Sequence, residues 1–102
     1  MQSKDQPPMQ ITATVVAVEV SYFSDGSVRT RITTDKGEIM FYGVAPFRKS
    51  DVISAKGKHV RPNELDQHAR ELLADISPGK SVFRAKEISE DTAGVTLHDL
   101  AI

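Results

Sequence analysis

The 102-residue sequence predicts a mainly β fold, a small closed barrel of five strands with one helix, and three observations support this class. A run of β-branched and small residues lies near the N-terminus, and two further β-like segments follow it across short turns. A single helical pattern of apolar residues occurs later in the chain. A chain of this length holds one compact domain, which we expect at residues 11–102. Residues 1–10 are polar and contain two prolines, so we expect a flexible tail there.

The first strand is predicted at residues 11–20, which read ITATVVAVEV. The middle of this run is apolar on both faces, a pattern typical of a strand that is buried on both sides or bent by a bulge. Ser24, Asp25 and Gly26 supply turn residues after it. Residues 27–34 alternate between an apolar face and a cationic face, and therefore predict a second strand with one side in water.

A third strand is predicted at residues 38–44, which completes a three-stranded meander. Two registers of its hairpin with the second strand are open. A two-residue turn of lysine and glycine places Arg31 opposite Tyr42, whereas a three-residue loop that adds the preceding aspartate places Arg31 opposite Phe41. The second register has the better turn chemistry, because its glycine sits where a positive φ is needed.

Residues 45–61 show no usable periodicity and are predicted to form a long basic loop with an exposed Lys-Gly-Lys-His tip, with a short ordered piece at residues 51–53 as an open alternative. A helix is predicted to begin near Pro62 or Asn63, with Asn63 as its cap. Its apolar residues form one stripe: Leu65, Ala69, Leu72, Leu73 and Ile76. A Pro-Gly pair ends the helix, and strands at residues 80–88 and 95–102 are predicted to form a closing hairpin.

Charge is distributed unevenly along the chain, although the net charge is only −1. Residues 28–61 carry eight cations against three anions, a net of +5, so the remainder carries −6. Aromatic rings lie among these cations, and positive charge interleaved with flat rings is the pairing that single-stranded nucleic acid requires. The predicted nucleic-acid-binding residues are Tyr22, Arg29, Arg31, Phe41, Tyr42, Phe47, Arg48, Lys49, Lys56, Lys58 and Arg61.

Several classes of chemistry lack a signature in this sequence. Cysteine is absent, which removes disulfides and sulfur-based metal sites and is consistent with a reducing compartment, so we expect a cytoplasmic protein. The three histidines lack the spacing of a metal site, and no nucleophile motif is present. We therefore expect no catalytic residue, no metal and no cofactor. We also expect no membrane span, because no apolar run approaches the roughly twenty residues that one requires.

The order of the predicted elements resembles that of an OB (oligonucleotide/oligosaccharide-binding) barrel, whose helix lies between the third and fourth of five strands. The segments PGKSV at 78–82 and VTLHDL at 95–100 also look like the last two strands of single-stranded-DNA-binding proteins of this class. The resemblance covers residues 9–102 and is one of topology and length. It implies a ligand that lies across strands two and three. At matching positions this surface offers Arg29, Arg31 and either Phe41 or Tyr42, with Tyr22 and Phe23 at its rim. Small plasmid-, phage- or primosome-type proteins are the better comparisons within the class.

The expected function is that of a non-enzymatic module that contacts single-stranded DNA or RNA through the second and third strands and the basic loop 45–61. The alternative is a protein–protein interaction domain that docks another protein through its acidic and basic poles, for example as an accessory or inhibitory factor of a plasmid or phage. A homodimer is a further expectation, since isolated barrels with open edges often pair.

Overall fold

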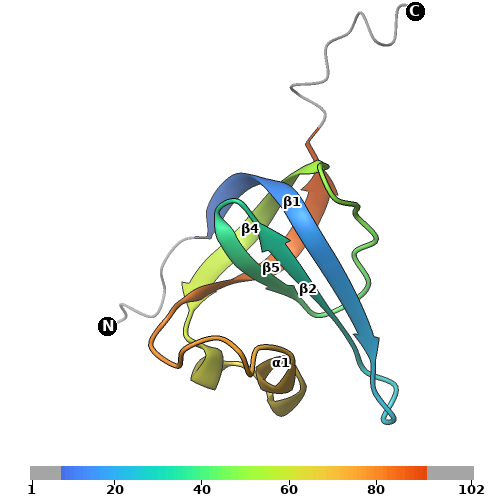
Figure 1. Ribbon diagram of the computed structural model, residues 1–102, viewed down its shortest axis with the longest axis vertical. Coiled ribbons are helices and arrows are strands. Elements are labelled where there is room, and N and C mark those ends of the chain that lie inside the picture. The colour runs from blue at the N-terminus through green and yellow to red at the C-terminus, as the bar shows by residue number, and fades with distance from the viewer. Residues whose placement is uncertain (1–7, 92–102) are drawn as a thin grey trace, which may run out of the picture.

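Five strands form a closed barrel with the order β1-β2-β3-β5-β4 (Figure 1), and the computed structural model describes residues 8–91. The strands are β1 (Met9–Tyr22), β2 (Val28–Thr34), β3 (Gly37–Phe41), β4 (Val52–Val60) and β5 (Val82–Glu90). A short 3₁₀ helix, η1 (Pro62–Glu64), and an α-helix, α1 (Gln67–Leu72), lie between β4 and β5. β3 and β5 pair in parallel, and the other neighbouring strands are antiparallel. The predicted class, a mainly β barrel with one α-helix, is confirmed.

The long strand β1 closes the barrel because its two halves pair with different neighbours. Its first half pairs with β4, and its second half pairs with β2. The register with β2 shifts between Val15 and Ala17, so a bulge lies where the sequence is apolar on both faces. β1 begins at Met9, which places the last two residues of the predicted tail, Met9 and Gln10, in the barrel. Pro8 precedes the strand, and residues 1–7 of that tail lie outside the described residues.

The β2–β3 hairpin adopts neither of the two predicted registers. Thr34 pairs with Gly37 and Arg31 pairs with Met40, so only Asp35 and Lys36 lie between the paired ends. Gly37 does take the positive φ that the sequence predicts, at 118°. The side chain of Thr34 accounts for the position of the turn at Asp35 and Lys36, since its hydroxyl accepts a hydrogen bond from the backbone N–H of Lys36 at 3.0 Å.

The prediction of one long loop at residues 45–61 is wrong, because residues 52–60 form β4. The lysines and glycine of this segment have low β propensity, but hydrogen-bonded ladders with β1 on one side and β5 on the other override it. Ile53 and Ala55 point into the barrel, whereas Lys56 and Lys58 are exposed. The helix therefore lies between β4 and β5, not between the third and fourth strands. The segment predicted as the fourth strand forms β5, and the predicted strand at 95–102 lies outside the described residues.

Gly57 lies in the middle of β4 and is buried, so it is not the tip of a loop. The register of β4 with β5 shifts between Lys56 and Gly57. A Cβ atom at Gly57 would lie only 1.9 Å from the backbone oxygen of Arg84, a distance that no side chain tolerates. The bulge at this point therefore requires a residue without a side chain.

The observed helix α1 is shorter than the apolar stripe from which the sequence predicted a helix. Leu65 has an extended backbone (φ −97°, ψ 166°), which separates η1 from α1. Asp66 caps α1 in place of the predicted Asn63, and its carboxylate accepts a hydrogen bond from the backbone N–H of Ala69 at 2.9 Å. The stripe itself is confirmed, since all five of its members belong to one hydrophobic cluster.

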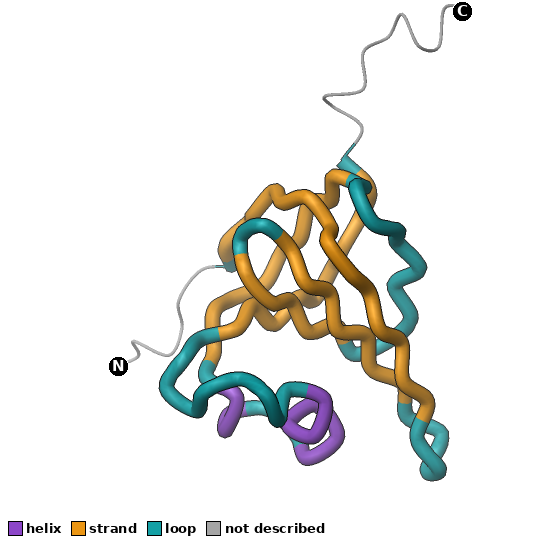
Figure 2. The backbone as a smooth tube through the Cα atoms, in the orientation of Figure 1, coloured by secondary structure: helices purple, strands orange, loops and turns teal. Residues whose placement is uncertain are grey.

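Two hydrophobic clusters lie on opposite faces of the sheet. The first fills the barrel and contains Ile32, Ile39 and Phe83. The second lies between the helical segments and the outer face of the strands, and it contains Met40 and Val60. Ile39 and Met40 are adjacent in β3 yet join different clusters, so the helices cover the outside of the barrel wall. Figure 2 shows both helical segments on the same side of the barrel.

Candidate functional site

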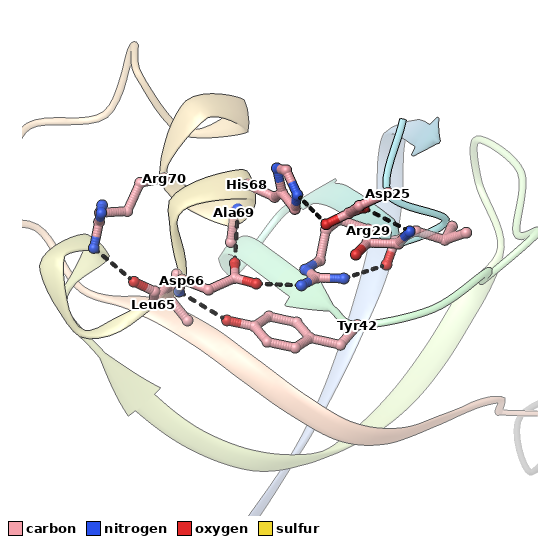
Figure 3. A network of polar contacts seen from close by, with 10 residues as sticks. Asp25, Arg29, Tyr42, Leu65, Asp66, His68, Ala69 and Arg70 are labelled. Carbon is pink, nitrogen blue, oxygen red and sulfur yellow. Dashed lines mark hydrogen bonds and ion pairs between the residues drawn. The ribbon is translucent and has the colours of Figure 1, made fainter. Parts of the chain in front are cut away.

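Arg29 of β2 is committed to contacts within the protein. Its guanidinium forms an ion pair with Asp66 and donates a hydrogen bond to the backbone oxygen of Val28 at 2.9 Å. The guanidinium carbon lies 4.2 Å from the centroid of the Tyr42 ring, and the Tyr42 hydroxyl accepts a hydrogen bond from the backbone N–H of Asp66 at 3.1 Å (Figure 3). The hydrogen bond from Arg29 lowers the pKa of Asp66 and raises that of Arg29. Arg29, Tyr42 and Asp66 thus form a closed network.

Arg31 is also occupied. It donates two hydrogen bonds to the carboxylate of Asp75, at 2.6 and 3.0 Å, and one to Glu38 at 2.9 Å. A fourth hydrogen bond, at 2.7 Å, goes to the backbone oxygen of Leu72. The hydrogen bond to Asp75 raises the pKa of Arg31 and lowers that of Asp75. Acids after β4 therefore neutralise the cationic face of β2, so the two charge poles expected from the sequence meet here.

Most of the predicted stacking rings are also covered. Phe41 and Phe47 pack against the cluster inside the barrel, and Tyr42 packs against the outer cluster. Phe23 stacks on His68 of α1 with a centroid separation of 3.9 Å. Tyr22 alone among these five rings is exposed, with 72% of its surface accessible. Of these five rings, therefore, only that of Tyr22, at the end of β1, is available for stacking with bases.

The tip of the β1–β2 hairpin is fastened to α1. His68 lies 3.0 Å from the carboxylate of Asp25, and the two side chains come from segments far apart in sequence (Figure 3). The hydrogen bond with His68 lowers the pKa of Asp25. Together with the Phe23 stack, this contact fixes the hairpin against the same helix that Arg29 and Arg31 bind.

The remaining predicted cations are not gathered in one place. Arg48 and Lys49 are exposed in the connection before β4, beside the β1 bulge, because the backbone N–H of Ser50 donates to the oxygen of Val15 at 2.8 Å. Lys58 lies six residues after Val52, the first residue of β4. At the rise per residue of a β-strand, this separation is roughly 20 Å. Arg61 is exposed immediately before η1. Arg48, Lys49, Arg61 and Lys58 therefore do not form one continuous basic loop.

A cation cluster that was not predicted lies on the outer face of β4 and β5. Lys58 pairs directly with Arg84 in the ladder, and Lys86 follows on the same face of β5. All three side chains are exposed, and within residues 8–91 none of them makes an ion pair. We call these three residues the β4–β5 cation face. With Pro8 and Gly57 they line a hollow of about 240 Å³.

The β4–β5 cation face adjoins the Arg29 network through one ring. The guanidinium carbon of Arg84 lies 5.0 Å from the centroid of the Tyr42 ring, on which Arg29 also rests. Like charges that face each other across a ladder destabilise a sheet. Lys58 and Arg84 are such a pair, and an anion placed between them would relieve the repulsion.

Lys56 lies beside the β4–β5 cation face but in a different environment. It pairs with Glu87 in the ladder, and the two residues line a separate hollow with Gln10. The sequence was sufficient to place Arg84 and Lys86 on one face of a predicted strand, since alternate residues of a strand share a face. It gave no signal that Lys58, itself a predicted binding residue, would pair with Arg84, because the segment that contains Lys58 was predicted as a loop.

The functional proposal rests on the geometry of the structure, because comparison with known proteins assigns no function. A scan against protein-family models and searches of curated proteins and of solved structures found no match. In residues 8–91, His, Asp and Glu do not form a group of three that could hold a metal ion. The helices of this described part are too short and too polar to cross a membrane.

Proposed function

We propose that the chain is a non-enzymatic module that binds single-stranded nucleic acid through the phosphate backbone at the β4–β5 cation face. The observation that carries the proposal is the facing pair of Lys58 and Arg84, extended by Lys86, with no carboxylate partner in the described residues. Arg84 and Lys86 are two residues apart, roughly 6.6 Å along the strand. Successive phosphates of an extended single strand of nucleic acid can therefore contact the two side chains.

An OB-like assignment of the barrel is part of this proposal. The closed five-stranded architecture supports it, whereas the helix between β4 and β5 departs from the helix position of that class. The ligand surface that we propose also differs from the strand-two and strand-three surface of the resemblance. Arg29 and Arg31 are paired with acids, so the free positive charge lies farther around the barrel.

The contact is electrostatic and tolerant of sequence. Three cations neutralise about three phosphates, and for a single strand this gives a slope of log K against log salt of about −2. Stacking adds little, because the ring of Tyr42 is covered and that of Tyr22 lies at the end of β1. We therefore expect weak binding that falls as the salt concentration rises.

The test is a fluorescence-anisotropy titration of labelled oligo(dT) at low salt with wild type, the variant Lys58→Gln/Arg84→Gln and the matched control Arg48→Gln/Lys49→Gln. Both variants remove two exposed cations. We expect the first to weaken binding about ten-fold or more and the control to change it less than about two-fold. A melting temperature measured for each variant separates lost binding from lost folding. Absence of binding at micromolar protein, or equal losses in both variants, contradicts the proposal.

A protein-docking domain is the second candidate. Within residues 8–91, five large apolar side chains are exposed, and they make no contact that a phosphate backbone requires: Met9, Val16, Tyr22, Val44 and Val52. The same titration separates the two candidates, because a docking domain leaves oligo(dT) free at low salt. The expected homodimer stays a prediction, which sedimentation equilibrium checks.

A further inference from the structure

A hollow of about 290 Å³ opens between the β2–β3 turn, the end of β4 and the start of β5. We call it the β3–β5 pocket. It is distinct from the β4–β5 cation face, with which it shares no lining residue. Its volume lies near the lower limit of ligand pockets, which run from roughly 300 to 1,000 Å³.

The pocket exists because β3 and β5 pair over a short stretch only. Their ladder runs from Ile39 and Phe83 to Phe41 and Ala85, so the strand ends before it diverge. Gly37 stands at the mouth, where a side chain would meet no neighbour within 4 Å. A gap in the barrel wall is therefore left open beside the β2–β3 turn.

The floor of the pocket is apolar. Ile39 and Phe83 belong to the cluster inside the barrel and are almost fully buried. Ile11 and Ile76 add half-buried surface from two other segments. The ring of His59 meets that of Phe83 edge to face, with centroids 5.1 Å apart. These groups offer van der Waals contact to a compact apolar or aromatic body.

The rim of the pocket is positively charged. Lys36 and Lys80 line it, and neither makes an ion pair within the described part of the chain. Lys36 donates one hydrogen bond to the backbone oxygen of Thr12 at 2.8 Å, which leaves two of its three N–H donors free. The one lining carboxylate, Glu38, already accepts hydrogen bonds from Arg31 and Thr33, both at 2.9 Å.

We infer that the β3–β5 pocket binds a small organic anion, namely a carboxylate or phosphate group joined to a compact apolar body. The anionic group lies between the ammonium groups of Lys36 and Lys80, and the body rests on the half-buried side chains of Ile11 and Ile76. An uncharged apolar molecule leaves the two ammonium groups without an anionic partner, and a bare anion leaves the accessible surface of Ile11 and Ile76 in contact with water. Both parts of the ligand are therefore needed. This inference does not rest on the proposed function.

The test is an amide NMR titration of the full chain with benzoate and with phenyl phosphate, which separates carboxylate from phosphate as the anionic group. Benzyl alcohol and acetate are the controls that lack the charge and the apolar body. We expect saturable shifts at Gly37, His59 and Ser81 with one or both acids, at most weak shifts with the controls, and none at Lys58 or Lys86.

Lys80→Gln should weaken binding of the responding acid roughly three- to five-fold, since exposed charge pairs contribute little individually. Lys49→Gln, which removes an exposed lysine elsewhere, should leave it unchanged. Lys80 is exposed, and its side chain has no polar partner among the described residues, so this variant keeps the fold. The inference is overturned if neither acid gives saturable shifts at the pocket, if a control shifts it equally, or if Lys49→Gln matches Lys80→Gln. Loss of oligo(dT) binding leaves this result untouched.

Discussion

Arg29 on β2 forms an ion pair with Asp66, the residue that caps α1. The two residues are 37 positions apart, and their contact joins the barrel wall to the helix that covers it. α1 has only six residues, too few to be stable in isolation, so its position depends on such contacts. One carboxylate thus performs two tasks, as a helix cap and as the counter-ion of a half-buried arginine.

Replacement of Asp66 separates these two tasks. Asp66→Ala removes the cap and leaves Arg29 without its counter-ion, so we expect a loss of about 1 to 2 kcal/mol in the free energy of unfolding. Asp66→Asn retains a capping oxygen and should lose clearly less. Urea unfolding followed by circular dichroism measures both. Equal stability of the alanine variant and wild type would show that the network does not hold the helix.

Acidification should weaken the same contacts. Arg29 and Arg31 lower the pKa of Asp66 and of Asp75 below the ordinary value of 3.8, so the unfolded chain takes up protons more readily than the folded chain. The stability that these carboxylates contribute is present above about pH 4 and is lost as the pH falls through their folded values. Urea midpoints measured from neutral pH downward should therefore fall in acid, and the fall should be smaller in Asp66→Asn. A steeper fall in that variant contradicts the assignment.

Gly57→Ala tests the close approach of β4 and β5. The new Cβ would meet the backbone oxygen of Arg84 at 1.9 Å, and backbone cannot move aside as a flexible side chain does. We expect a loss of at least about 2 kcal/mol. Gly79→Ala is the matched control, because no atom lies within 4 Å of its added Cβ and its φ is not strained. It should stay within about 0.5 kcal/mol of wild type. Comparable losses in both variants would exclude the clash as the cause.

The buried hydroxyl of Thr30 is predicted to hold the connection that follows β3. It donates to the backbone oxygen of Gly43 and accepts from the backbone N–H of Ala45 at 3.1 Å. Thr30→Val preserves the shape of the side chain but leaves both groups unpaired, so we expect a loss of about 1 to 3 kcal/mol. Thr12→Val, at an exposed site on β1, should change the unfolding free energy by less than about 0.5 kcal/mol. Thermal unfolding of the two variants decides between these outcomes.

Local pattern was sufficient to predict four strands and the apolar stripe of the helical segment. β4 was missed because Lys56, Gly57 and Lys58 weaken its β signal, whereas its stability comes from ladders with strands distant in sequence. The β2–β3 register was missed for a local reason, since a hydrogen bond from the backbone of Lys36 to the Thr34 side chain selects a two-residue turn at Asp35 and Lys36.

The candidate site was predictable only in part. Lys58 was among the predicted residues, but its partners Arg84 and Lys86 were not, because cross-strand pairing is a property of the assembled barrel. For the same reason no local pattern showed that Asp66 and Asp75 would neutralise Arg29 and Arg31. A count of charges along the chain cannot tell a free cation from a paired one.

The salt dependence of oligo(dT) binding tests the central proposal most directly. We expect a slope of log K against log salt of about −2 for wild type between about 50 and 200 mM salt, and of about −0.7 for Lys58→Gln/Arg84→Gln, because two of three phosphate contacts are removed. The control Arg48→Gln/Lys49→Gln should keep the wild-type slope. A slope in Lys58→Gln/Arg84→Gln that equals the wild-type slope would contradict binding at the β4–β5 cation face.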